Sequence, residues 1–424
     1  MMNNYSVYME IMGTPQMVGS IYGNGISDAV FQYSREYINS ENSLPISVSL
    51  PISDKPFTQK ETKSFFEGLL PEGFSRKSVA SWIKTDEEDY LSILAALGRE
   101  CLGALMIVQE DEKEESGYKL LTIDKVRELA SEGATRSTQI LMETHLSLAG
   151  ASGKVGLYYD EDKDKWYLPE GKAPSNYIVK QSHVRLSSIV LNEELCMLTA
   201  KELGIETPKC FIINTGTGLD SEVLFATNRY DRIISSEKKI DGLKVPYRLH
   251  QEDFAQAMGI PSSQKYETKK KGYLSRMFEI IREYTSDPIG EQMKLWRIIC
   301  FNYLIGNGDA HIKNYSLLYS ENLKRMTVAP AYDIICTRCY NLRDEMSMFI
   351  GDDINFRHIK RSSFIEAAKE AGLTERIALR IFDEVADGLE KALEKASELL
   401  KETEIPGIDK LKNNILESSG YRYL

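Results

Sequence analysis

A glycine-rich stretch in the C-terminal half of the chain, GNGD at 306–309, carries an aspartate, and an asparagine follows five positions later. The carboxylate of Asp309 could orient a hydroxyl nucleophile and accept its proton, and the amide oxygen of Asn314 could ligate Mg²⁺. This D-x4-N spacing is typical of loops that catalyse phosphoryl transfer, although an isolated instance is also compatible with a polar turn. Asp333 follows an apolar stretch at the distance expected of a second Mg²⁺ ligand, so the combined pattern favours catalysis.

A lysine ends the strand-like segment SNYIVK at 175–180. Because an unpaired buried ammonium group is costly, we expect Lys180 to face an anion, and a nucleotide phosphate suits the chemistry of the downstream loop. The next predicted helix, 191–203, has two carboxylates near its start, and either Glu193 or Glu194 can pair with this lysine.

A second segment that could contact phosphate is SLAGASGK at 147–154. Its glycine N–H groups could approach phosphate oxygens, and Lys154 could add a positive charge. It is not a P-loop, because Leu148 and Val155 stand where that motif requires Gly and Ser or Thr. On this evidence a plain turn and a phosphate-binding loop are equally compatible with the segment.

The segment VLFATNRYDR at 223–232 is typical of a strand that runs into a hinge, where backbone groups could meet a nucleotide base. A purely structural alternative is equally open for Asp231 and Arg232, which could form a salt-bridged loop.

The elements that must position these residues follow from hydrophobic periodicity. Strand-like segments are predicted at 154–159, 175–180, 209–213 and 222–228, and mainly helical patterns follow after residue 250. An apolar helix over 295–305 leads into the GNGD stretch, and a last long helix begins after Gly372 and its predicted cap Thr374. A strand-rich part followed by a helical part predicts an α+β enzyme with its site between two lobes.

The N-terminal region has its own pattern. A hairpin is predicted over 5–22, a short strand over 45–51 and a helix around 65–70, while the acidic run at 110–115 marks a boundary. We therefore expect three parts, with bounds at 1–110, 140–250 and 251–424.

Composition limits the partners that the chain can have. It has 424 residues, with 52 Lys and Arg against 63 Asp and Glu, so the formal net charge is −11. Such an acidic chain is a poor free-standing nucleic-acid binder, because phosphate contacts need a cationic face. The six cysteines include one Cys-x-x-Cys pair, Cys336 and Cys339, without a second pair or a nearby histidine, so we expect reduced thiols and not a zinc site. Neither a signal peptide nor a membrane span is evident, which favours a cytoplasmic location.

Taken in order, several stretches resemble the HipA family, bacterial serine/threonine kinases that act as toxins of toxin–antitoxin pairs. They span nearly the whole chain: LPISVSLPIS, FFEGLLPEG, LGRECLGAL, SLAGASGKVGLY, SNYIVK, NRYDR, RLHQEDFAQAMGIPSSQKYE, FNYLIGNGDAHIKNYSLL and APAYDII. The resemblance implies a two-lobed protein-kinase-like α+β core with a small β-rich N-terminal subdomain and a mainly helical C-terminal lobe.

Position by position, the resemblance implies Asp309 as catalytic base, Asn314 and Asp333 as Mg²⁺ ligands and Ser147 as an autophosphorylation site. Of the two carboxylates early in the predicted helix, Glu193 is the expected ion-pair partner of Lys180. The resemblance implies ATP contacts from the phosphate loop, the hinge, the catalytic loop and the segment after it: Ala149, Gly150, Ala151, Ser152, Gly153, Lys154, Lys180, Asn228, Arg229, Tyr230, His311, Ile312, Lys313, Asn314, Tyr332, Asp333, Ile334 and Ile335. Phosphate on Ser147 would add negative charge beside ATP and expel the loop.

The resemblance further implies ATP and Mg²⁺ as cofactors, a protein substrate such as an aminoacyl-tRNA synthetase, growth arrest and persistence, and a helix-turn-helix antitoxin of the HipB type. Operator DNA would be reached mainly through that antitoxin. Two departures from the family pattern, Ser152 in the phosphate loop and the lysines 269–271, concern nucleotide and substrate contacts. The open alternatives are a small-molecule phosphotransferase and a non-catalytic kinase-fold co-repressor.

Overall fold

The computed structural model describes residues 3–41, 43–98, 100–109, 116–131, 154–182, 186–340, 342 and 344–423. The chain divides into two compact units. The first unit comprises Met1–Gln181, Ala226–Ser262 and Leu318–Arg325, and the second comprises Ser182–Phe225, Ser263–Leu317 and Met326–Leu424.

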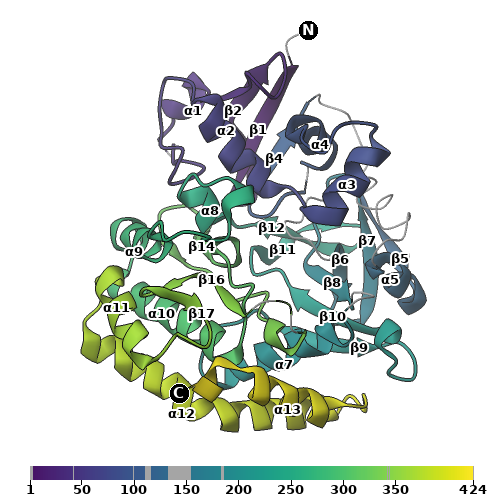
Figure 1. Cartoon of the computed structure of the whole chain (residues 1–424). Coiled ribbons are helices and arrows are strands. Elements are labelled where there is room, and N and C mark those ends of the chain that lie inside the picture. Colours follow the sequence, from purple (N-terminus) through teal and green to yellow (C-terminus); the bar gives the residue numbers. More distant parts are fainter. Residues whose placement is uncertain are drawn as a thin grey trace. The chain divides into compact units, whose positions relative to one another are not determined.

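A four-stranded antiparallel sheet opens the first unit (Figure 1). Its strand order is β3-β2-β1-β4, from β1 (Asn3–Ile11), β2 (Thr14–Gly23), β3 (Val30–Tyr33) and β4 (Leu105–Val108). The predicted hairpin is confirmed: Ile11 pairs with Thr14, and Met12 and Gly13 between them both have positive φ, as a two-residue hairpin turn requires.

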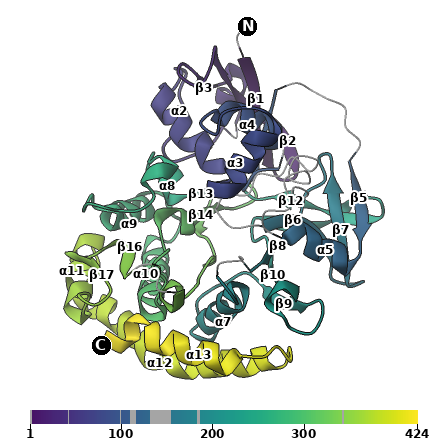
Figure 2. The ribbon, with the colours of Figure 1, turned by 45° about the vertical axis from the view of Figure 1, so that its right-hand side comes forward.

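Helices α1, α2 and α4 pack against strands of this sheet, and Figure 2 shows α2 and α4 beside it. The helices are α1 (Arg35–Ile38), α2 (Gln59–Phe66), α3 (Gly73–Trp82) and α4 (Tyr90–Leu97). Phe31 of β3 packs its ring 5.3 Å from that of Phe66 of α2, and both side chains are fully buried. The predicted helix around 65–70 is thus the end of α2 and a short 3-10 turn, Glu67–Leu69.

The predicted strand at 45–51 is wrong. The chain turns there, with a single bridge between Ser47 and Leu50. The carboxylate of Glu252 explains the difference, because it accepts hydrogen bonds from the Ser47 hydroxyl (2.5 Å) and the Val48 N–H (3.0 Å). A side-chain acceptor therefore takes the place of the neighbouring strand that the alternating pattern anticipated.

The second sheet of the first unit has the order β5-β7-β6-β8-β10. Its strands and the elements that follow are β5 (Gly117–Leu121), α5 (Ile123–Ala130), β6 (Lys154–Asp160), β7 (Lys165–Glu170), β8 (Tyr177–Gln181), β10 (Val223–Asn228), β11 (Arg232–Ile240), β12 (Leu243–Arg248), β13 (Gln251–Asp253) and α8 (Phe254–Ala257). The boundary between the units falls within β10. A core of Tyr118, Tyr158, Ala173, Leu243 and Val245 joins this sheet to the β11–β12 hairpin.

The second unit is mainly helical. Its elements are α7 (Ile189–Glu202), β9 (Cys210–Asn214), α9 (Tyr273–Tyr284), α10 (Pro288–Ile305), β14 (Ser316–Tyr319, which crosses into the first unit), β15 (Met326–Val328), β16 (Glu345–Ile350), β17 (Asp353–Asn355), α11 (Arg361–Ala371), α12 (Glu375–Lys401) and α13 (Ile408–Ser418). Helix α12 packs on α7, α10 and α11, and α13 runs beside it in yellow in Figures 1 and 2.

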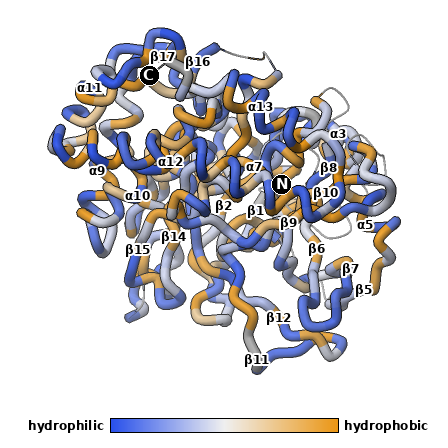
Figure 3. Tube along the Cα trace, turned by 90° about the horizontal axis from the view of Figure 1, so that it is seen from below, coloured by the Kyte–Doolittle hydropathy of each residue, from blue (hydrophilic) through white to orange (hydrophobic). Residues whose placement is uncertain are grey.

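The long predicted helix is confirmed as α12. Its apolar stripe, including Phe382, Leu389 and Leu393, is buried, and Figure 3 shows hydrophobic and hydrophilic residues alternating along its tube. Gly372 ends α11 in the left-handed conformation as predicted. Thr374 is the N-cap residue of α12, although its hydroxyl makes no capping hydrogen bond. The α+β class, with a strand-rich N-terminal part and a helical C-terminal part, is confirmed.

Across the described ranges, no helix combines the length and the apolar character that crossing a bilayer requires.

Candidate active site

Helix α10 delivers the GNGD stretch. Asp287 caps its start by accepting a hydrogen bond from Gly290 N–H (3.1 Å), and Pro288 occupies the first turn, where its missing N–H costs nothing. The helix ends at Gly306, whose φ of 84° permits the reversal into the loop. Residues 306–314, the candidate catalytic loop, therefore leave a well-defined helix end.

Buried Asn307 holds the start of the catalytic loop. Its backbone N–H donates to the carbonyl of Asn302 (2.8 Å), and its side-chain oxygen accepts the backbone N–H of Asp309 (3.1 Å). The side chain of Asp309 itself is exposed. A rigid, buried asparagine thus presents an accessible carboxylate, which is the arrangement that a general base needs.

Asn314 is brought to Asp309 by the loop. The loop closes with a single 3-10 turn, Ile312–Asn314, and the side-chain nitrogen of Asn314 donates to the backbone carbonyl of Asp309 (2.8 Å). This bond fixes the amide and leaves its oxygen, Oδ1, as the atom that could ligate a metal ion. The two residues of the D-x4-N pattern are therefore joined within the described structure.

Tyr266 is a site residue that sequence reasoning missed. Its hydroxyl donates a hydrogen bond to Oδ1 of Asp309 at 2.5 Å, and its ring stands edge-on to the ring of His311, with centroids 5.2 Å apart. The only signal in the sequence is that Tyr266 lies within one of the stretches that carry the family resemblance, the KYE of PSSQKYE.

The neighbouring Glu267 fastens this tyrosine to the loop's surroundings. Its carboxylate accepts backbone N–H groups of Lys271 (2.6 Å) and Phe349 (3.1 Å), and its own N–H donates to Ser347 O (2.8 Å). The Ser347 hydroxyl in turn donates to Gly308 O (2.7 Å). Strand β16 therefore contacts both the residue beside Tyr266 and the catalytic loop, through one backbone hydrogen bond and through the side chains of Glu267 and Ser347.

The segment that carries Asp333 is tied to the catalytic loop through Tyr332. The Tyr332 hydroxyl donates to the carbonyl of Lys313 (2.9 Å) and accepts from the Ser316 hydroxyl (2.6 Å). Asp333 adopts the left-handed conformation with φ of 53°, which non-glycine residues rarely adopt and which often marks a functional position. Ile334 beside it is buried, and Ile335 is half-buried.

The two predicted phosphate lysines lie in the first unit and are cross-strand partners. In the antiparallel pair of β6 and β8, Lys154 is directly opposite Lys180, so both side chains project from the same face of the sheet. Lys180 is buried and Lys154 half-buried. Two ammonium groups on one face repel each other and together would attract a polyphosphate.

The predicted hinge contains an acceptor suited to a nucleotide base. The Oδ1 atom of Asn228 is buried and accepts no hydrogen bond from any described residue. Buried polar atoms are normally paired, so this oxygen fits a donor such as the exocyclic amine of adenine. The hydroxyl of Tyr230 donates to the side chain of Gln251.

The side chain of Arg229 belongs to a buried network of ion pairs. Asp231 and Arg232 belong to the same network, as the structural alternative of a salt-bridged loop predicted. The Arg229 guanidinium binds Glu100 (2.8 Å) and Asp231 (2.9 Å), and Arg232 binds the same two carboxylates at 3.0 and 2.8 Å. All four side chains are at most 5% exposed. The Arg229 backbone is engaged as well, because its N–H donates to the Asn176 carbonyl (2.8 Å) and its carbonyl accepts the Arg232 N–H (3.1 Å).

Glu100 is the centre of this network. Arg248 adds a third guanidinium to its carboxylate. Burial by itself would raise the pKa of Glu100, but the positive charges of Arg232, Arg248 and Arg229 hold that pKa below its ordinary value. The network joins the end of the N-terminal region to the hinge within the first unit.

Of the two candidate carboxylates for the lysine ion pair, Glu194 has another partner. Burial raises the pKa of Glu194 to about 7, and the thiol of Cys210 bonds to its carboxylate. A partly neutral carboxyl group is a poor partner for an ammonium ion. Glu193 is also buried in α7, and its pairing with Lys180 stays a prediction.

Another charged stretch singled out from the sequence is engaged elsewhere. Lys270 pairs with Asp352 (2.8 Å) and Glu370 (2.5 Å), so this lysine is not a free docking charge. The predicted site residues Ser147 and Ala149–Gly153 lie outside the described residues.

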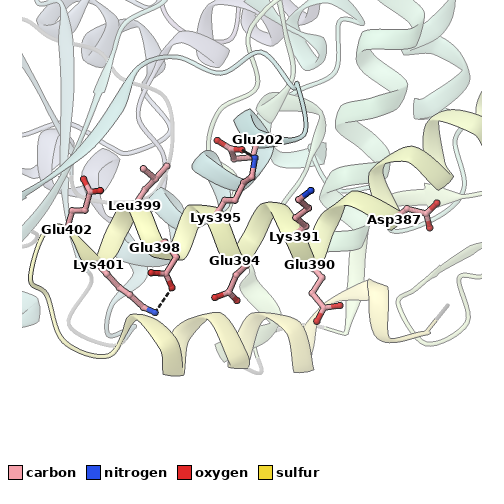
Figure 4. Close-up of a pocket in the computed structure, with 10 residues that line it drawn as sticks. All are labelled: Glu202, Asp387, Glu390, Lys391, Glu394, Lys395, Glu398, Leu399, Lys401 and Glu402. Carbon is pink, nitrogen blue, oxygen red and sulfur yellow. Dashed lines mark hydrogen bonds and ion pairs between the residues drawn. The ribbon is translucent and has the colours of Figure 1, made fainter.

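An open groove of about 1050 Å³ lies along α12 and contains none of the predicted site residues. Figure 4 shows its lining, in which Lys401 is bonded to Glu398 and most other side chains are acidic or basic. Ion-paired charges on one helix form a solvated surface, and the groove is therefore separate from the candidate active site.

Two family models match the chain: the HipA N-terminal domain over residues 9–108, and the HipA-like C-terminal domain over residues 146–393. The second match alone covers more than half of the chain. The chain belongs to the HipA family. The resemblance seen in the sequence is thereby confirmed.

Two relatives of this HipA-family chain are named as kinases. "Putative kinase Y4mE" of Sinorhizobium fredii is 31% identical over 399 residues, which cover 91% of each protein. "Serine/threonine-protein kinase toxin HipA" of Shewanella oneidensis is 24% identical over 354 residues, covering 80% of this chain and 77% of that protein.

A solved structure also matches the fold. It is the complex of HipA, HipB and operator DNA from Shewanella oneidensis, whose HipA-like chain matches with a TM-score of 0.79 at 21% identity, over 99% of this chain and 97% of that one. The match shows that the whole chain, including its N-terminal region, has the same fold.

Proposed function

We propose that this HipA-family chain is an ATP- and Mg²⁺-dependent serine/threonine protein kinase that acts as the toxin of a toxin–antitoxin pair. The observation that carries the proposal is the constellation in the second unit, where exposed Asp309, Asn314 and the Asp333 segment are held together by short hydrogen bonds. The kinase names of the relatives support the same activity.

In this proposal Asp309 accepts the proton of the substrate hydroxyl, and the hydrogen bond from Tyr266 orients its carboxylate. Asn314, through Oδ1, and Asp333 would hold Mg²⁺, since amide and carboxylate oxygens are the ligands that this ion prefers. Bound Mg²⁺ would neutralise charge on the transferring phosphate. The buried, fixed neighbours of these side chains keep reorganisation small during the reaction.

The first unit would bind the nucleotide. Lys154 and Lys180 would hold the phosphates from one face of the sheet, and the unpaired acceptor of Asn228 would receive the adenine amine. Glu193 would orient Lys180. These residues fit ATP because two cations and one buried acceptor match the charged and the hydrogen-bonding ends of the molecule.

Regulation and partners are part of the proposal. Ser147 would be autophosphorylated, and the added negative charge would expel its loop from the nucleotide site. The net charge of −11 supports operator contact through a more basic helix-turn-helix antitoxin of the HipB type. The substrate would be a protein of translation, such as an aminoacyl-tRNA synthetase, and its phosphorylation would arrest growth.

The test is transfer from radiolabelled ATP, with wild-type protein and Asp309→Asn compared. We expect label on a protein of a bacterial lysate and on Ser147, and no label with Asp309→Asn. Label on a small-molecule panel and not on protein would instead establish a small-molecule phosphotransferase. Equal results for wild type and variant, with no label in either, would establish a non-catalytic co-repressor.

A further inference from the structure

Two cysteines stand side by side in the turn that follows the Asp333 segment. The Sγ atoms of Cys336 and Cys339 lie 3.3 Å apart, within S–H···S contact, around a 3-10 turn, Thr337–Tyr340. A disulfide requires an S–S distance of about 2.05 Å, so the two sulfurs need to approach by only about 1.2 Å. All the cysteines of the described structure, these two included, are free thiols.

The two thiols differ in reactivity. The neighbouring thiol of Cys336 lowers the pKa of Cys339, against the opposing effect of burial, while burial raises the pKa of Cys336 well above its ordinary value. Cys339 is half-buried and Cys336 is buried. The more acidic thiol is thus also the one that solvent reaches, which is the division of roles found in reactive Cys-x-x-Cys pairs.

The turn that carries the pair also supports the catalytic loop. Thr337, between the two cysteines, accepts the backbone N–H of Gly308 on its hydroxyl oxygen (2.8 Å). Cys336 is anchored by Asn192, whose side chain bonds both its N–H (2.9 Å) and its carbonyl (3.1 Å). A Cβ placed on Gly306 would lie only 3.1 Å from the Cys336 sulfur, so turn and loop are tightly packed.

We propose that Cys336 and Cys339 form a redox-active dithiol that closes to a disulfide with a low-molecular-weight disulfide as oxidant, and that closure displaces the catalytic loop through Thr337. A bond between sulfurs three residues apart must tighten the turn, because Cys336 is held by Asn192. Gly308 directly precedes Asp309, and its N–H is the group through which that movement reaches the loop.

The reaction balances without any further reagent. The Cys339 thiolate attacks one sulfur of the oxidant, whose S–S bond breaks and releases one thiolate that takes a proton. Cys336 then attacks the Cys339 sulfur, the mixed disulfide breaks, and the proton of Cys336 leaves with the second thiol. The protein dithiol is oxidised by two electrons, and the small disulfide is reduced to two thiols.

The disulfide can be tested directly, because trypsin cleaves after Arg338 and so separates the two cysteines into different peptides. The full-length chain is incubated with oxidised glutathione, its free thiols are alkylated, and it is digested with trypsin. A disulfide joins peptide 326–338 to peptide 339–343, and reduction separates them. We expect this linked pair in wild type, its absence in Cys339→Ser, and its retention in Cys210→Ser, which removes another half-buried thiol.

Recovery of both peptides singly alkylated at every glutathione ratio would overturn the dithiol, and so would a stable glutathione adduct on Cys339 alone. The peptide result is independent of enzymatic activity. The effect on the loop rests on the proposed kinase function and is read separately: oxidation should lower phosphoryl transfer several-fold, reversibly, in wild type and not in Cys339→Ser. A linked pair with unchanged transfer would overturn the coupling, whereas reduced wild type without transfer would overturn the kinase function.

Discussion

The hydroxyl of Tyr266 donates a hydrogen bond to Oδ1 of Asp309 at 2.5 Å, although the two residues are 43 positions apart. The bond orients the carboxylate that, in the proposed function, accepts the substrate proton. Because Glu267 pins the tyrosine through backbone groups, the donor is held in place before substrate arrives. Tyr266 is therefore a positioning residue for the proposed base.

Replacement of Tyr266 by phenylalanine removes this hydrogen bond and keeps the ring against His311. Hydrogen bonds to charged groups contribute roughly 1.5–3 kcal/mol, so we expect kcat to fall about tenfold or more. The KM for ATP should not change, because the nucleotide residues are untouched. Steady-state kinetics of label transfer measure both constants.

A matched control is Tyr273→Phe, which removes a hydroxyl bonded to the Gln264 carbonyl and not to Asp309. It should retain the wild-type kcat. If Tyr266→Phe were as active as wild type, the tyrosine would serve only to pack its ring, and Tyr266→Leu would then be the more damaging change.

The proposed metal site can be tested at Asp333 with a substitution that tolerates its left-handed backbone conformation. Asparagine tolerates the left-handed conformation, so Asp333→Asn removes the charge without adding strain. We expect the Mg²⁺ concentration for half-maximal transfer to rise about tenfold or more, since a carboxylate is the stronger ligand. Titration of activity with Mg²⁺ measures the change, and Asp352→Asn, on an exposed turn, should leave it unaltered.

Lys180→Met tests the nucleotide site through binding alone. Loss of a charge-assisted contact with phosphate should weaken ATP affinity about tenfold, equivalent to about 1.4 kcal/mol. Because ATP stabilises the folded state in proportion to its affinity, the thermal shift that ATP produces should shrink. Lys165→Met, at an exposed position of β7, is the control. An undiminished thermal shift for Lys180→Met would remove this lysine from the nucleotide site.

Glu100→Gln addresses stability. It leaves three buried guanidinium groups short of one carboxylate, and we expect the free energy of unfolding to fall by roughly 3–5 kcal/mol. Because the pKa of Glu100 is lowered on folding, its contribution is present above its ordinary value of 4.5 and is lost as the pH falls below it. Urea unfolding between pH 7 and pH 3 should therefore show a weaker acid dependence in the variant.

The exposed Glu87→Gln serves as the control for that experiment, since its pairing with Lys77 is at the surface. Equal stability of Glu100→Gln and wild type would mean that solvent enters the network and that its ion pairs are individually weak.

Local patterns predicted the catalytic loop and its helix because both lie in one contiguous stretch, where a glycine and an apolar run fix the geometry. The alternation of apolar and polar residues at 45–51 predicted a strand that is not there. The carboxylate that holds this segment in a turn belongs to Glu252, which is remote in the sequence. The same reason explains why Tyr266 was missed. Contacts between distant segments leave no periodic signal.

The lysines illustrate an intermediate case. The sequence predicted phosphate binding for Lys154 and for Lys180 separately, from the residue type and the neighbouring strand of each. Only the register of β6 and β8 shows that the two lysines lie directly opposite each other. A salt bridge between Asp231 and Arg232 could be foreseen, whereas the second partner of Arg232, Glu100, could not, since it is more than a hundred residues away. Residue types suggest a site, and register and long-range pairing decide its members.

The buried ion-pair network around Glu100 affects which fragments of this protein can fold. One family model ends at residue 108 and the other begins at residue 146. Glu100 lies before this division, and the arginines that it neutralises, among them Arg229 and Arg248, lie after it. A gene fragment that began after residue 110 would encode three arginines with a missing counterion. The two segments are therefore expected to be exchanged between genes, and expressed in the laboratory, only as a pair.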